Sequence, residues 1–101
     1  MIFEASIEMK ENTPLAAQVA ENLALLYATR EGEQPLDREF GLSTDFLNLP
    51  MPAARAQLSA QIIRKTSQYE SRARVVKVEW EDTDAAQGKL CPKVVVELGE
   101  Y

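Results

Sequence analysis

The sequence predicts an α+β fold in which two main helices pack on a small antiparallel sheet. Two long segments place apolar residues at helical spacing, and shorter segments alternate apolar with polar residues. Between the helical segments lies a connection, residues 30–52, that is rich in proline and glycine and also in large apolar side chains. It has too many turn-forming residues for a regular element and too many apolar ones for a free linker. We therefore expect an ordered connection that wraps onto the core.

Length and composition indicate one globular domain, residues 1–101. The net charge of −5 argues against a nucleic-acid partner, because binding the phosphate backbone needs a basic surface. No stretch approaches the roughly 18 apolar residues of a membrane span. The first residues lack the basic and apolar regions of a secretion signal. We expect no membrane interaction and a cytoplasmic protein, or one assembled into a particle built in the cytoplasm.

The first elements are a strand and a helix. Residues Phe3–Met9 alternate between apolar and polar side chains, as in a half-buried strand. Thr13 and Pro14 predict a helix start, because the threonine hydroxyl can cap the helix and proline suits its first turn. Gly32 is expected to close this helix in a left-handed conformation. The apolar stripe of the helix is Leu15, Val19, Leu23, Leu26 and Tyr27.

In the connection, we expect Leu36 and Phe40 to be buried anchors. A short helix should begin near Ser43 or Thr44 and end before Pro50.

The second helix leads directly into a strand hairpin. Pro52 should start the helix at Ala53, and residues 68–69 should end it. The strands Arg74–Glu81 and Leu90–Leu98, joined by a polar loop, should pair antiparallel. The last strand has a free edge for partner binding unless the N-terminal strand covers it. The expected common core is Leu23, Leu26, Phe40, Leu58, Ile62, Val76, Val78, Val94 and Val96.

Arrangements of residues that could catalyse a reaction or bind a metal are mostly absent. The chain has no histidine, so its one cysteine, Cys91, lacks the usual activating base and is expected to be an inert core thiol. The run Asp82-Thr83-Asp84 resembles the start of a calcium loop, but the glycine falls one position late and Lys93 stands where glutamate is needed. We therefore expect no catalytic residue, no metal, no cofactor and no small-molecule substrate.

A dense run of charge lies where the second helix meets its strand. Glu70, Arg72 and Arg74 fall within five residues there. Carboxylate and guanidinium groups can make bidentate contacts that fix the orientation of a protein partner. Glu70 and Arg72 can equally brace the joint internally, and the sequence leaves both roles open.

Two segments together resemble the baseplate wedge proteins of contractile tails. Residues 69–75 resemble the glutamate-proline-arginine motif that follows the long helix of that family, although Ser71 stands where the family has proline. That family includes the wedge component called a tail lysozyme in T-even phages and the matching subunit of type VI secretion systems, and an anti-adaptor regulator shares its fold. The other matching segment carries Leu25, Leu26, Thr29, Gly32, Pro35, Phe40 and Gly41.

The resemblance implies a structural, non-enzymatic protein of a phage tail, a tail-like particle or a type VI-like system. It would join larger baseplate wedge subunits to the sheath protein, with Glu70, Arg72 and Arg74 at the partner contact. It would then be assembled into a phage or phage-like particle. The alternative is a soluble anti-adaptor-like module that binds a regulatory protein. A peptidoglycan hydrolase is disfavoured, since no spacing of carboxylates singles out a catalytic pair.

Overall fold

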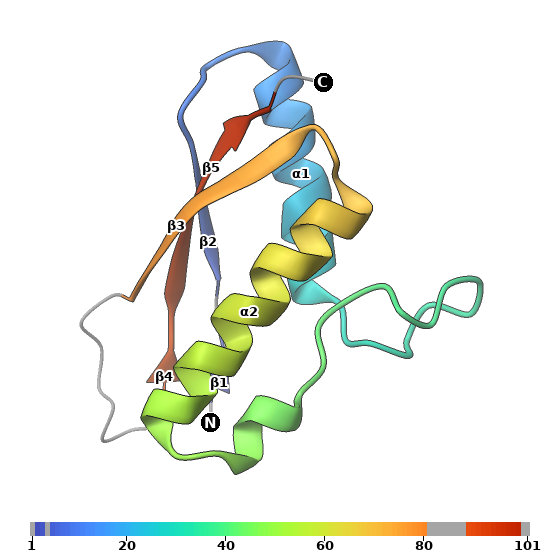
Figure 1. Cartoon of the computed structure of the whole chain (residues 1–101). Helices are drawn as coiled ribbons and strands as arrows, with labels where there is room; N and C mark the ends of the chain where they lie inside the picture. The colour runs from blue at the N-terminus through green and yellow to red at the C-terminus, as the bar shows by residue number, and fades with distance from the viewer. Residues whose placement is uncertain (1, 4, 81–88, 100–101) are drawn as a thin grey trace.

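The computed structural model describes residues 2–3, 5–80 and 89–99 (Figure 1). Helices α1 (Pro14–Ala28) and α2 (Met51–Tyr69) pack on a sheet formed by β2 (Ser6–Met9), β5 (Pro92–Leu98) and β3 (Ala73–Trp80). A second, very small sheet pairs β1 (Ile2–Phe3) with β4 (Lys89–Leu90). The connection contains one 3₁₀ turn, η1 (Asp45–Asn48). The α+β class and the order of elements are therefore as the sequence predicts.

The sheet is mixed rather than purely antiparallel, which corrects one part of the sequence prediction. Strand β3 pairs antiparallel with β5, as a short hairpin requires, but β2 pairs parallel with β5 and sets Ile7 opposite Val94. Strand β5 is consequently the central strand, with order β2-β5-β3. The sequence left open whether the last strand has a free edge, and the structure decides this: the N-terminal strand covers that edge.

The local signals at the start of α1 and the end of α2 are confirmed. The Thr13 hydroxyl accepts a hydrogen bond from the backbone N–H of Ala16 at 3.1 Å, and Pro14 is the first helical residue. Helix α2 ends at Tyr69 as expected. Helix α1 ends at Ala28, earlier than predicted, because Thr29 already has an extended backbone. Gly32 does have a left-handed φ of +94°, but it lies in the following turn.

The core lies between the two helices and the facing side of the sheet. Leu23, Leu26, Leu58, Ile62, Val94 and Val96 are buried there, as predicted. Phe40 and Val78 pack against this cluster and are partly buried.

Two residues expected in the core are exposed. Val76 is 41% exposed because a bulge between Val75 and Lys77 shifts the strand register and moves Val75 to the inner side. Leu36 is fully exposed, so it is not a buried anchor. The polar loop at residues 81–88 lies outside the described residues. Of the helices that the structure does describe, neither combines the length and apolar character that crossing a bilayer requires.

A buried polar contact also joins the helices. The hydroxyls of Tyr27 on α1 and Thr66 on α2 are 2.6 Å apart. Burial raises the pKa of Tyr27 to about 12, and the hydrogen bond with Thr66 opposes part of that rise. This tyrosine therefore stays neutral and can satisfy Thr66 inside the core.

Candidate functional site

Glu70 lies at the joint between α2 and β3, and its backbone groups form hydrogen bonds to both sides of that joint. It follows the last residue of α2, and its N–H donates to the Thr66 carbonyl at 2.9 Å. Its own carbonyl accepts from the N–H of Ala73 at 3.0 Å, so the chain turns tightly into β3. Glu70 is only 6% exposed. A carboxylate buried to this extent needs compensating donors.

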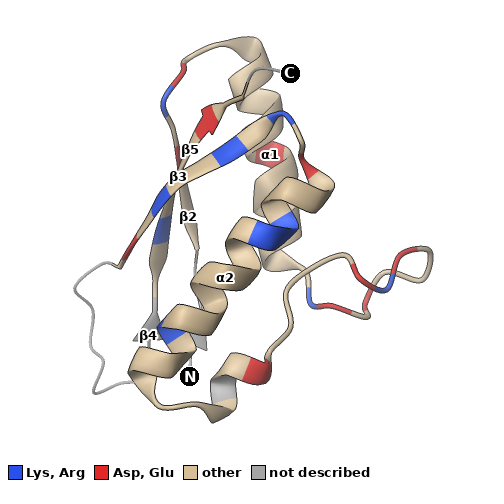
Figure 2. Cartoon of the chain, viewed as in Figure 1, with Lys and Arg blue, Asp and Glu red and all other residues tan. Residues whose placement is uncertain are grey.

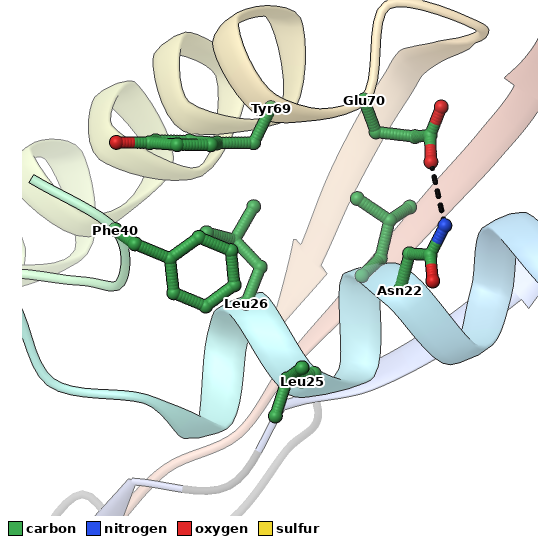
Figure 3. A pocket seen from close by; sticks show the side chains of 7 residues that line it. Asn22, Leu25, Leu26, Phe40, Tyr69 and Glu70 are labelled. Carbon is green, nitrogen blue, oxygen red and sulfur yellow. Dashed lines mark hydrogen bonds between the residues drawn. The ribbon is translucent and has the colours of Figure 1, made fainter. Parts of the chain in front are cut away.

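Those donors are Arg72 and Asn22. Arg72 donates from Nε to Glu70 Oε1 at 2.8 Å and from Nη2 to Oε2 at 3.0 Å. Asn22 of α1 donates to Oε2 at 3.0 Å (Figure 3). The hydrogen bonds from Arg72 hold the pKa of Glu70 below its usual value despite burial, and Asn22 adds to this effect. The same pair raises the pKa of Arg72. The joint is thus a fixed ion pair tied to α1.

The predicted site residues are only partly brought together. Glu70 and Arg72 form a bidentate ion pair, which we call the fork, and the Arg72 side chain remains 40% exposed. Arg74, on β3, forms an ion pair with Glu97 of β5 and is 70% exposed. The hydrogen bond and charge of Arg74 lower the pKa of Glu97, against the smaller effect of its desolvation. The bracing contact that the sequence left open is present, and both arginines still present charge at the surface.

A pocket of about 160 Å³ lies beside the joint, between α1 and the end of α2 (Figure 3). Phe40 and Tyr69 meet edge to face, with ring centroids 5.1 Å apart, and form one wall. Leu25 lines the pocket and is 57% exposed. The other lining residues are Asn22, Leu23, Leu26 and Glu70. The pocket is therefore mainly apolar and has the buried carboxylate at one end.

Sequence reasoning missed how α2 holds the connection. Gln61 is buried, and its side-chain amide forms hydrogen bonds with both backbone groups of Ser43. It accepts from the Ser43 N–H at 2.7 Å and donates to the Ser43 carbonyl at 3.0 Å. Lys65 is 3% exposed, and its amine donates to the Glu31 carboxylate at 2.9 Å and to the Glu39 carbonyl. A lysine is rarely buried unless its charge is paired.

Tyr69, four residues after Lys65, is the third residue of α2 that holds the connection. Its hydroxyl donates to Asp37 Oδ1 at 3.0 Å. Desolvation, this hydrogen bond and the nearby carboxylates of Asp37, Glu39 and Glu31 raise the pKa of Tyr69 to about 12. We call Gln61, Lys65 and Tyr69 the anchor stripe. Their spacing of four residues was visible in the sequence and places them on one face of α2.

Nothing in the described residues provides a metal site, since they contain no group of three or more candidate ligands. Cys91 is a free, partly buried thiol.

The comparisons with known proteins identify the family. No curated protein and no solved structure matches the chain significantly. A family model described as "Baseplate wedge protein gp25" matches residues 13–98. This match includes both helices, the connection, the joint and the β3–β5 hairpin. The chain therefore belongs to the gp25 family of baseplate wedge proteins.

Proposed function

We propose that this protein joins larger baseplate wedge subunits to the sheath of a contractile injection machine. Family membership indicates a structural protein of a phage baseplate, which assembles with other baseplate subunits in the particle. In this proposal, Glu70, Arg72 and Arg74 contact a wedge subunit. The sheet contacts the sheath.

The observation that supports the proposed wedge contact is the fork formed by Glu70 and Arg72. Glu70 uses two of the five guanidinium N–H groups and fixes the plane of Arg72. The exposed part of that guanidinium can then form a directional contact with a carboxylate or carbonyl of a partner. Because the side chain is already ordered, binding loses less conformational entropy. Glu70 acts here by positioning Arg72, and Arg74 adds a second exposed charge.

The sheath contact is assigned to the outer edge of β3. Since β5 is central, β3 pairs on one side only among the described residues. An added strand can satisfy the backbone groups on the other side. The bulge at Val75–Lys77 and the ion pair between Lys77 and Glu79 make this edge less open to unspecific pairing.

A co-purification experiment tests the wedge contact. Arg72→Ala should abolish recovery of the wedge partner from assembled particles. It should retain the fold but melt earlier than the wild type, because the buried Glu70 carboxylate loses its hydrogen bonds from Arg72. Arg64→Ala, which removes an exposed arginine from α2 instead, is the matched control and should retain the partner. Full recovery with Arg72→Ala and with Arg72→Ala/Arg74→Ala would assign the fork to bracing alone.

A further inference from the structure

We infer that Asn22 of α1 is a positioning residue for the fork: by donating to Glu70, it fixes the direction in which Arg72 presents its unused N–H groups. Asn22 lies 48 residues before Glu70 in the chain and acts through it. The inference rests on the wedge contact proposed above, and it assigns the geometry of that contact to a residue outside the joint.

The joint by itself does not fix where the fork points. Glu70 and Arg72 both belong to the short turn between the end of α2 and the start of β3. Their mutual hydrogen bonds hold the two side chains to each other, and not the pair to the rest of the molecule. Ser71 stands between them, and serine does not lock the backbone φ as a proline would. A further contact from a rigid element is therefore needed.

Asn22 supplies that contact from a fixed position. The next residue, Leu23, is fully buried in the core, so the backbone of α1 is held in place there. Asn22 donates to Glu70 Oε2 at 3.0 Å, and this is the oxygen that also accepts from Arg72 Nη2 at 3.0 Å. Two donors from different elements thus meet at one oxygen. The carboxylate, whose last torsion is otherwise soft, cannot rotate without breaking one of these hydrogen bonds.

The composition of α1 also singles out Asn22. Asparagine is unfavourable in the middle of a helix, and most of the neighbouring residues are alanine and leucine. Glu21 is the only charged residue of α1 (Figure 2), so no basic group of this helix competes with Arg72 for the Glu70 carboxylate. A neutral amide holds the carboxylate in place and leaves its charge to pair with the arginine.

The consequence is a single free face on Arg72. Glu70 accepts from the Nε–H and from one N–H of Nη2, and among the described residues the other N–H groups of Arg72 donate to nothing. Two of these, on Nη1 and Nη2, lie at the outer end of the planar guanidinium and match the two oxygens of one carboxylate. Asn22 therefore sets the angle at which an acidic side chain of the wedge partner meets this end.

The test is NMR of the isolated, ¹⁵N-labelled chain, read at the Nε–Hε group of Arg72. Asn22→Leu removes the donor and places a good helix former at an exposed position, so the fold should be retained. The Arg72 Hε should exchange with water about tenfold faster, since a hydrogen bond that orders its acceptor is lost. The pKa of Glu70 should rise, because Asn22 is one of the groups that lower it.

Two further variants sharpen the test. Gln18→Leu is the matched control, because it removes an exposed amide one turn earlier on the same face of α1, and it should change neither the Hε exchange nor the pKa of Glu70. Asn22→Asp has the same shape but replaces the donor with a carboxylate, so it should raise the pKa of Glu70 further than Asn22→Leu does. In assembled particles, Asn22→Leu should lose most of the wedge partner, whereas Gln18→Leu should retain it.

Unchanged Arg72 Hε exchange in Asn22→Leu, or an equal change in Gln18→Leu, would overturn the inference. A lower melting temperature with unchanged exchange and full partner recovery would assign Asn22 a structural role only. Full recovery with Asn22→Leu, where Arg72→Ala abolishes it, would likewise overturn its role in binding. If Arg72→Ala itself retains the partner, the wedge contact fails instead. The NMR measurement uses the isolated chain, so it still decides whether Asn22 positions Arg72.

Discussion

At the residue scale, the core rests on side chains whose burial follows from helical spacing. Leu58 and Ile62 are both 0% exposed on α2. Leu58→Ala or Ile62→Ala should lower the free energy of unfolding by roughly 2–5 kcal/mol, a large share for a small domain. Ile63→Ala, on the exposed side, should change it by less than about 0.5 kcal/mol. Denaturant unfolding measures all three, and a loss below about 0.5 kcal/mol at both buried sites would contradict this packing.

Glu70 gives the joint a dependence on pH. Its pKa in the folded state lies below the ordinary value of 4.5, chiefly because Arg72 donates to it. A lowered pKa stabilises the fold above about pH 4.5, and this contribution is lost as pH falls through the folded-state pKa. Glu70→Gln should therefore melt earlier than the wild type at pH 7, and the difference should shrink below pH 4.5. Thermal melts across pH 2.5–7 test this, and a difference that stays constant with pH would contradict it.

At the element scale, the connection depends on one close backbone approach. Gly41 has a φ of +108°, and a Cβ there would lie 2.5 Å from the Thr29 carbonyl oxygen. That approach sets the hydrogen bond from the Leu42 N–H to the same oxygen, at 2.9 Å. The glycine is needed both for its conformation and for lack of a side chain.

Gly41→Ala should therefore destabilise the chain more than Gly32→Ala. Gly32 also has a positive φ, but a Cβ there would meet nothing within 4 Å. We expect about 1–2 kcal/mol from the conformation alone at Gly32 and a larger loss at Gly41. Chemical denaturation of the two variants measures the difference, and equal losses would show that the close approach is unimportant.

The sheet makes a second prediction at this scale. Strand β5 is bonded on both sides, so the amides of Val94, Val95 and Val96 should be strongly protected from exchange in the isolated chain. Proline at Val95 should disrupt the whole sheet rather than a docking edge. Rapid exchange of all three amides would mean that β2 does not pair there in solution.

At the scale of the whole molecule, the N-terminal strand completes a sheet that the rest of the chain leaves open. The family match begins at residue 13, after β2, yet β2 pairs with β5 over four residues, and the Lys10 N–H donates to the Val96 carbonyl at 2.9 Å. Removing residues 1–10 would expose one side of the central strand.

That deletion should lower the melting temperature and cause association through the exposed β5 edge. Size-exclusion chromatography at several protein concentrations, with thermal melts, measures both effects. Replacing Glu8 with alanine, which removes only an exposed ion pair with Lys93, should leave both properties nearly unchanged. A monomeric deletion variant with unchanged stability would show that β2 contributes little.

The candidate site shows where prediction from sequence ends. Glu70 and Arg72 are two residues apart, so their possible pairing was visible in the chain. Asn22 is 48 residues from Glu70, and no local pattern indicates that α1 supplies the third hydrogen bond. The spacing of the anchor stripe was visible, but its role was hidden, because polar residues on a helix face ordinarily indicate exposure to solvent.

The sequence by itself determined the order of the elements, the cap at Thr13 and the antiparallel pairing of β3 with β5. These depend on interactions between residues close along the chain, where spacing and turn chemistry decide. The tertiary structure decided the parallel pairing of β2, the bulge that exposes Val76 and the full exposure of Leu36. Those features depend on contacts between distant segments. There, the fit of whole elements against one another overrides the preference of any single residue.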